Sequence, residues 1–187
     1  PMLGWHGIRR SLDQPDILKC ELEALKKLHE EGLDNVVWEI PFIINVDELR
    51  NAKEIARQMG APDNFGIMVE VPACALTIEK FCEEGIAFAS FGSNDLTQTC
   101  LGIDRDNENL AKIFDEMHPA MQFLFKHVIE VCKKYKVESS ICGELPMKEY
   151  LASLSPPSTD SRRNEYFPLS IFAYALRGVS KSASISL

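Results

Sequence analysis

Two carboxylates of this chain stand beside apolar segments, where an unpaired charge is costly. Glu70 lies inside the run MVEVP, and Asp95 follows the apolar run FASFG. One interpretation is that Glu70 forms a buried salt bridge with an Arg or Lys of a helix. The other is that Glu70 and Asp95 are ligands of Mg²⁺, which takes one or two carboxylates and completes its coordination with water and substrate oxygens. The second interpretation predicts a magnesium cofactor.

Asp95 belongs to a short polar run, GSND, that directly follows FASFG. A plain surface turn would explain Gly and Asn here, because both residue types tolerate positive φ. Alternatively, the backbone N–H groups of Gly92, Ser93 and Asn94 form a nest for an anion beside the metal. A metal next to an anion site would suit a phosphorylated or carboxylated substrate.

Cys142 follows the segment VESSI and precedes Gly143. A free cysteine at such a position is commonly a buried structural residue. A thiol can also act as a general acid that delivers a proton to a carbanion or enolate at neutral pH. Gly143 would leave room for a substrate to approach this thiol.

Helical periodicity alternates with short apolar runs along the chain. The predicted helices cover residues 13–31, 46–60, 75–85 and 109–136, the last with a break or a new first turn at Pro119. The predicted strands cover residues 35–44, 65–72, 86–92 and 137–144. This alternation indicates parallel β/α units.

Such units build either a doubly wound sheet or a (β/α)8 barrel. No glycine fingerprint of the dinucleotide type follows any predicted strand, which disfavours the doubly wound sheet. Glu70, Asp95 and Cys142 fall near strand ends, and barrel enzymes hold their chemistry at the carboxyl ends of their strands. We therefore predict an α/β fold of the (β/α)8 barrel class.

Composition excludes several classes of partner. The 187 residues are 45% hydrophobic, enough for a core, and the net charge is −8 with no basic stripe, so we expect no binding to nucleic acid or to membranes. No apolar run is long enough to span a membrane, and the first residues do not form a secretion signal, so we expect a cytoplasmic location. The six cysteines show no C-x-x-C pair, which disfavours a zinc site and a disulfide framework.

Five sequence blocks resemble a known family. In order they are GWHGIRR, IPF, IMVEVP, SFGSNDLTQ with the following LGIDR, and SICGE, within residues 1–147. Together they resemble the PEP/pyruvate-binding barrel of the PEP-utilising enzymes. Within that family the GW before His6 is similar to the archaeal-type phosphoenolpyruvate synthases. Pyruvate, phosphate dikinase and the first enzyme of the sugar phosphotransferase system are the alternatives.

The resemblance implies roles for individual residues. Glu70 and Asp95 match the Mg²⁺ ligands, and Cys142 matches the acid/base that exchanges a proton with the methyl or methylene carbon of pyruvate or PEP. Ser93 and Asn94 match residues that hold the substrate carboxylate and phosphate, whereas His6 replaces an Arg of the family. The substrate-binding residues that we expect are therefore Gly92, Ser93, Asn94, Asp95, Gly143 and His6.

The resemblance also implies that residues 1–152 form an incomplete barrel, roughly its second half. The ATP-binding and phosphohistidine domains that phosphorylate pyruvate in the family are expected partners outside this chain. The isolated chain should therefore lack the full reaction, and a non-catalytic remnant is the rival interpretation. The open sheet edge would invite association with a second copy.

Residues 153–187 are rich in serine and poor in acidic residues, so we expect a disordered or non-native tail.

Overall fold

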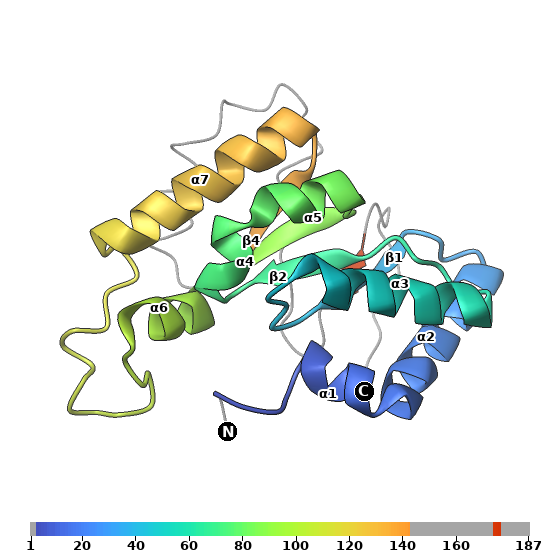
Figure 1. Cartoon of the computed structure of the whole chain (residues 1–187), viewed down its shortest axis with the longest axis horizontal. Coiled ribbons are helices and arrows are strands. Elements are labelled where there is room, and N and C mark those ends of the chain that lie inside the picture. Colours follow the sequence, from blue (N-terminus) through green and yellow to red (C-terminus); the bar gives the residue numbers. More distant parts are fainter. Residues whose placement is uncertain (1–2, 143–173, 177–187) are drawn as a thin grey trace, which may run out of the picture.

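The computed structural model describes residues 3–142 and 174–176 (Figure 1). Its helices are α1 (Ile8–Asp13), α2 (Pro15–Glu30), α3 (Val46–Met59), α4 (Pro72–Leu76), α5 (Ile78–Glu84), α6 (Ser93–Leu101) and α7 (Pro119–Tyr135). Its strands are β1 (Val36–Ile40), β2 (Gly66–Val69), β3 (Phe88–Gly92), β4 (Glu138–Cys142) and β5 (Tyr174–Leu176). The predicted alternation of strands and helices is confirmed.

The five strands form one sheet in the order β4-β3-β2-β1-β5. Strands β1 to β4 are parallel, and β5 is antiparallel to β1. The parallel strands follow one another in chain order without the reversal that marks a doubly wound sheet. This is the winding of a (β/α)8 barrel, with four β/α strands present and the sheet left open among the described residues. The predicted fold class is confirmed.

The helices form a layer that follows the strand order. Helix α2 contacts α3, α3 contacts α5, and α5 contacts α7. Helix α3 shows how the local sequence fixes such an element: Asn45 and Glu48 form a capping box at its start, and Gly60 ends it with φ 62°. Helix α6 lies beyond the end of β3 and contacts α4 and α7 (Figure 1).

Alternate strand residues face the helix layer. Phe91 of β3 packs edge-on against Phe125 of α7, with ring centroids 4.8 Å apart. Ile40 and Val69 are buried in the same core. Because successive strand residues point to opposite faces, Glu39 lies on the other, inner face of the sheet.

The predicted helix over residues 109–136 is too long at its start, because the helix begins only at Pro119. Residues 102–118 form turns and irregular loop structure instead. In this segment the side-chain oxygens of Asp104, Asn107 and Asp115 each accept a hydrogen bond from the backbone N–H two residues further on. Such local bonds compete with a helix, so the apolar periodicity does not prevail there.

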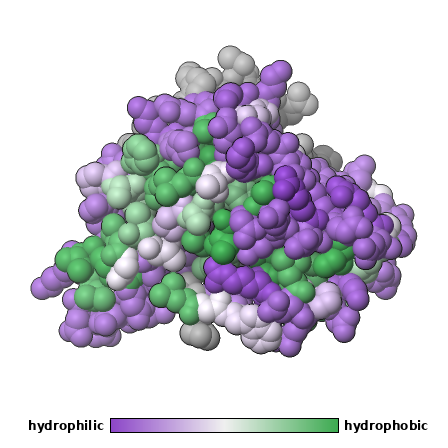
Figure 2. Space-filling model, viewed as in Figure 1, coloured by the Kyte–Doolittle hydropathy of each residue, from purple (hydrophilic) through white to green (hydrophobic). Residues whose placement is uncertain are grey.

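Exposed apolar side chains occur in several parts of the surface, among them Ile17 of α2 and Leu33, which follows α2. Figure 2 shows hydrophilic residues over much of the right-hand part of the view and apolar residues in the left-hand part, where α6 and the loop after it lie in Figure 1. Ile113, in the loop after α6, and Phe123, in α7, are also exposed. No helix in the described part of the chain is long and apolar enough to cross a membrane.

Part of the sequence-based interpretation falls on residues that the structure does not describe. Gly143 and most of the serine-rich segment 153–187 belong to this group, as does the domain boundary at residue 152. Only Tyr174–Leu176 of the segment is described, as β5. Disorder of the tail therefore stays a prediction.

Candidate active site at the carboxyl ends of the strands

The sheet order brings the predicted residues to one edge. Glu70 directly follows β2, Gly92 ends β3, and Cys142 ends β4, and these three strands are neighbours. Gly92 and Cys142 are paired in the register of β3 and β4. The alternation of strand residues places all three on the inner face. Carboxylate, glycine and thiol therefore form a row across the end of the sheet.

Glu70 is held tightly in this row. Its side chain is buried, and its Oε1 accepts a 2.7 Å hydrogen bond from the backbone N–H of Phe42. A Cβ atom added to Gly92 would stand 2.8 Å from Oε2 of Glu70. The absence of a side chain at Gly92 thus makes space for the carboxylate. No salt bridge to Glu70 occurs among the described residues, so a buried ion pair is not what compensates it there.

The environment of Glu70 favours its protonated form in the absence of a bound cation. The pKa of Glu70 is raised to about 7, mainly by burial and in addition by the nearby charge of Asp95. The hydrogen bond from Phe42 and the charge of Arg105 act in the opposite direction. Burial outweighs the hydrogen bond, which means that Glu70 lacks a full counter-charge.

Asp95 lies in the first turn of α6, so the polar run GSND begins a helix rather than forming a plain surface turn. Its Oδ1 is 3.2 Å from Nη1 of Arg105, yet this oxygen accepts no aligned hydrogen bond in the structure. The side chain of Asp95 is 20% exposed. Arg105 is thus an ion-pair partner that partly neutralises Asp95 and leaves it accessible.

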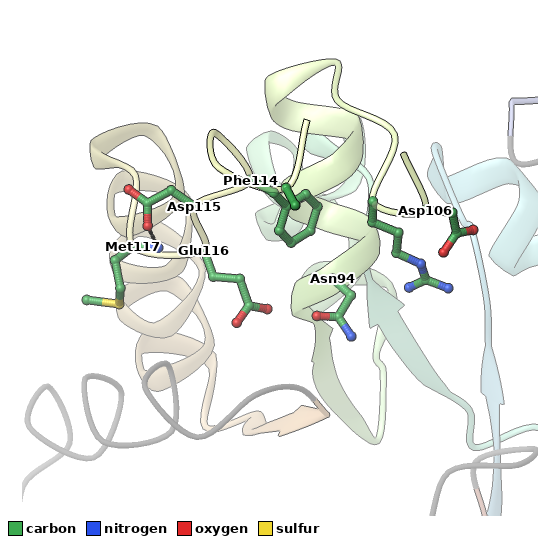
Figure 3. A pocket seen from close by; sticks show the side chains of 8 residues that line it. Asn94, Asp106, Phe114, Asp115, Glu116 and Met117 are labelled. Atoms are coloured by element: carbon green, nitrogen blue, oxygen red, sulfur yellow. Dashed lines mark hydrogen bonds between the residues drawn. The ribbon is translucent and has the colours of Figure 1, made fainter. Parts of the chain in front are cut away.

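Ser93 and Asn94 take different positions at the start of α6. Ser93 is fully buried, and its hydroxyl donates a 2.7 Å hydrogen bond to Oε1 of Glu116. Asn94 instead lines a cavity of about 550 Å³ together with Arg105, Phe114 and Glu116. Figure 3 shows Asn94 and Glu116 on either side of the space below Phe114. Asn94 faces an open volume, whereas the hydroxyl of Ser93 is engaged by the protein.

His6 lies beside the loop that follows β1. Its ring packs against Phe42 with centroids 4.1 Å apart, and its Nε2 is buried without a hydrogen-bond partner. The N–H of Ile8 donates to the backbone oxygen of Pro41, which fixes this segment on the loop. Phe42 has the uncommon φ of 53° and also donates its N–H to Glu70. His6 is therefore linked to the strand-end edge indirectly: it contacts Phe42, and Phe42 donates a hydrogen bond to Glu70.

Glu39 is a residue of this region that the sequence interpretation missed. It is 7% exposed, its Oε1 has no hydrogen-bond partner, and burial together with the charge of Glu70 raises its pKa to about 8. The signal was present in the sequence, because a carboxylate inside the apolar run VVWEI resembles Glu70 inside MVEVP. Two buried carboxyl groups on the inner face leave the region short of positive charge.

Cys142 and the acidic side chains complete the strand-end edge. Cys142 is half-buried at the end of β4, whereas Gly143 is not described. No group of three or more His, Cys, Asp or Glu side chains in the described part of the chain is arranged to hold a metal ion. A metal at this edge would have to use a pair of carboxylates together with water and substrate.

Most of the chain matches one known protein family. Residues 1–155 match the model of the PEP-utilising enzyme, PEP-binding domain. The chain belongs to the PEP-utilising enzymes. The recognition of this family from the five sequence blocks is therefore confirmed.

Similar proteins support the same assignment. The chain is 55% identical over 148 residues to a probable phosphoenolpyruvate synthase of Pyrococcus horikoshii, which covers 77% of this chain and 18% of that protein. It is 52% identical over 155 residues to a probable phosphoenolpyruvate synthase of Methanocaldococcus jannaschii, covering 81% of this chain and 13% of that protein. A phosphoenolpyruvate-protein phosphotransferase of Haemophilus influenzae is 36% identical over 156 residues, covering 78% of this chain and 27% of that protein. The chain thus spans only a small part of the length of these relatives.

Proposed function

We propose that the strand-end edge binds pyruvate or PEP together with Mg²⁺, as the substrate site of a phosphoenolpyruvate synthase. The observation that carries this proposal is the excess of carboxylates around Glu70. Among the described residues, Glu70 and Glu39 are buried without a salt bridge. Asp95 forms an ion pair there only with Arg105, which is itself partly exposed. A cation would remove this imbalance.

The residues present fit Mg²⁺. Glu70 and Asp95 influence one another electrostatically at the same edge, and two carboxylates are sufficient for this ion when water and substrate complete its octahedron. When bound, Mg²⁺ would polarise the carbonyl group of pyruvate and make its methyl protons more acidic. Glu70 and Asp95 would hold the ion, and Phe42 would orient Glu70.

Other residues of the edge would act on the substrate. Cys142 would exchange a proton with the methyl carbon of pyruvate or the methylene carbon of PEP. The first N–H groups of α6, at Ser93 and Asn94, and the backbone at Gly92 would bind the anionic groups, since a helix N-terminus favours negative charge. Asp95 would contact the substrate through the ion, and His6 would supply a hydrogen bond where the family carries Arg. We place Gly143 in the same group because it follows Cys142.

The complete reaction would need further domains. We propose that a phosphohistidine domain carries the phosphoryl group from an ATP-binding domain to pyruvate at this edge, overall from ATP, pyruvate and water, in the cytoplasm. The relatives named phosphoenolpyruvate synthase, at 55% and 52% identity, favour this enzyme over the phosphotransferase at 36% identity. The latter remains the second candidate within the family.

Calorimetric titration with oxalate tests the site without the rest of the reaction. Oxalate resembles the enolate of pyruvate, and it should bind the purified chain only when Mg²⁺ is present. Glu70→Gln and Asp95→Asn should weaken binding by at least about tenfold. Glu54→Gln, on the exposed side of α3, is the matched control and should bind normally. Mg²⁺-independent binding of oxalate would contradict the proposed site.

Deuterium exchange into the methyl group of pyruvate, followed by NMR, tests the role of Cys142. Exchange should require Mg²⁺ and should disappear in Cys142→Ala, but not in Cys20→Ala, where the cysteine is exposed on α2. The isolated chain should not make PEP from pyruvate and ATP, because phosphoryl transfer depends on groups positioned by the other domains. PEP synthesis by this chain alone would overturn that division of roles.

A further inference from the structure

The hydroxyl of Thr99, in α6, touches the backbone of both carboxylate residues of the strand-end edge. Thr99 lies one helical turn after Asp95, and its Oγ1 is 2.7 Å from the backbone oxygen of Asp95 and 3.1 Å from that of Leu96. The same Oγ1 is 3.1 Å from the backbone oxygen of Glu70, which directly follows β2. One side chain thus joins the helix that carries Asp95 to the strand end that carries Glu70.

The contact with Glu70 is not one that a threonine makes merely by being in a helix. Such a hydroxyl commonly donates to a backbone oxygen three or four residues earlier, and the contacts of Thr99 with Leu96 and Asp95 are of this local kind. Glu70 is 29 residues away along the chain. A hydroxyl carries one proton, which it can share between neighbouring acceptors. The contact with Glu70 therefore depends on the tertiary fold and not on the helix.

Thr97, two residues earlier on the same helix, is the natural comparison. It is fully buried, and its hydroxyl has no hydrogen-bond partner in the described part of the chain. Removing the hydroxyl of Thr97 would therefore break no hydrogen bond, whereas removing that of Thr99 would break a link between α6 and the end of β2.

The two carboxylates are otherwise held by separate parts of the chain. The N–H of Phe42 donates to Oε1 of Glu70, and Arg105 pairs with Oδ1 of Asp95. Neither contact restrains the distance between the carboxylates, because each involves only one of them. The Thr99 hydroxyl contacts the backbone of both residues and so restrains that distance.

Strand pairing does not replace this restraint. Strands β2 and β3 are paired as far as Val69 and Phe91, so Glu70 lies beyond the last paired residue of β2. Asp95 lies beyond the end of β3, in α6. The contact with Thr99 thus acts at the point where the ladder of backbone hydrogen bonds has ended.

We propose that Thr99 is a positioning residue, which holds the carboxylates of Glu70 and Asp95 at the separation that a divalent cation requires. This inference rests on the proposed metal site. Thr99 is not itself a ligand of the ion, because its hydroxyl is engaged by backbone oxygens. Residues that orient metal ligands in this way typically change the affinity for the metal by about 10–100-fold when they are substituted.

Binding of Mn²⁺ to the full chain, followed by electron paramagnetic resonance, tests the proposal. Mn²⁺ takes the same oxygen ligands as Mg²⁺ and is visible to this method. Thr99→Val keeps the shape of the side chain but removes its hydroxyl, and it should raise the dissociation constant by at least about tenfold. Thr99→Ser, which keeps a hydroxyl, should bind within about threefold of the wild type. Thr97→Val, the matched control, should bind as the wild type does.

The carbonyl ¹³C resonance of Glu70 reports on the same contact without any metal. Loss of a hydrogen bond to a carbonyl oxygen moves this resonance upfield, so it should move in Thr99→Val and stay in place in Thr97→Val. Circular dichroism should show that both variants keep the helical content of the wild type. If Thr99→Val does not fold, Thr99→Ala replaces it in both measurements.

Glu70→Gln distinguishes failure of this inference from failure of the proposed function. If the wild-type chain does not bind Mn²⁺, or binds it no better than Glu70→Gln does, the proposed metal site is wrong and this inference falls with it. Wild-type affinity in Thr99→Val, together with lost affinity in Glu70→Gln, would overturn the positioning role alone. An unmoved Glu70 carbonyl resonance in Thr99→Val would also overturn it, because the hydroxyl would then not be bonded to that oxygen.

Discussion

Gly92 and Glu70 approach each other so closely that a Cβ atom on Gly92 would stand 2.8 Å from Oε2 and 2.9 Å from Cβ of Glu70. The second of these atoms is attached to the backbone of the neighbouring strand and has little freedom to move away. The glycine that ends β3 is thus part of the pocket for the buried carboxylate. Its φ of −86° is open to any residue, so the constraint is space and not backbone conformation.

Gly92→Ala should destabilise the protein and displace Glu70. We expect a loss of about 1–3 kcal/mol in the free energy of unfolding, typical of an added methyl group without room. Urea denaturation measures this loss, and Mg²⁺-dependent oxalate binding should weaken in parallel. Ser90→Ala, on the same face of the same strand, adds no atom and is the matched control. Wild-type stability of Gly92→Ala would refute the tight packing.

Stability without added metal should fall as the pH rises from about 5 to 8. The folded-state pKa values of Glu39 and Glu70 are raised to about 8 and about 7, so the folded chain binds protons that the unfolded chain has already released. The stabilising effect is complete below the unfolded value near 4.5 and is lost as the pH passes through the folded values. Denaturant titrations should show a decline of about 1–2 kcal/mol per pH unit in this window.

The substitution Glu39→Gln separates the contributions of Glu39 and Glu70 to this pH dependence. It removes one of the two titrating side chains and should reduce that pH slope by roughly half. Glu54→Gln, on the exposed side of α3, should leave the slope unchanged. A slope that is the same in Glu39→Gln and the wild type would mean that Glu39 does not hold an extra proton in the folded chain.

Mg²⁺ should stabilise the chain more at pH 8 than at pH 6. At the lower pH, protons compete for Glu70, whose pKa is raised to about 7. A concentration about one hundred times the dissociation constant should add about 2.7 kcal/mol at the higher pH. Thermal melts with Mg²⁺ and with EDTA measure the difference, and Asp95→Asn should lose most of it. An equal effect of Mg²⁺ on Glu70→Gln would place the ion elsewhere.

The hydrogen bond between Ser93 and Glu116 should stabilise the segment 102–118 against α6. Ser93→Ala should cost about 1–3 kcal/mol, because a buried bond to a carboxylate is lost. A double-mutant cycle with Glu116→Ala should give a coupling energy of about 1–2 kcal/mol. Additive effects of the two substitutions would show that the bond contributes little to stability.

The sequence predicted the strand-end row because that prediction needs only local information. Apolar runs identify the strands, parallel order aligns their carboxyl ends, and Glu70, Gly92 and Cys142 follow from their positions along the chain. The contact of Ser93 with Glu116 was not predictable in this way, because it depends on the path of residues 102–118. That path is set by side-chain-to-backbone bonds that interrupt the helical periodicity.

Glu39 was overlooked in the sequence for a different reason. Glu39 carries the same signal as Glu70, a carboxylate in an apolar strand, but no neighbouring residue in the sequence suggests chemistry. Its importance follows from the inner face that it shares with Glu70, and a face is known only once the register is known. The position of His6 beside Phe42 likewise depends on how the first segment packs on the loop after β1.

The hydrogen bond from Phe42 to Glu70 makes one backbone amide a spectroscopic reporter. The nitrogen of this amide lies 2.7 Å from a buried carboxylate oxygen, so its proton should resonate downfield and exchange slowly with solvent. Protonation of Glu70 would weaken the bond and move the resonance upfield, whereas a cation on the other oxygen would shift it without that loss of protection. In a ¹⁵N-labelled chain this single cross-peak would show whether Glu70 carries a proton, a cation or neither, independently of any turnover.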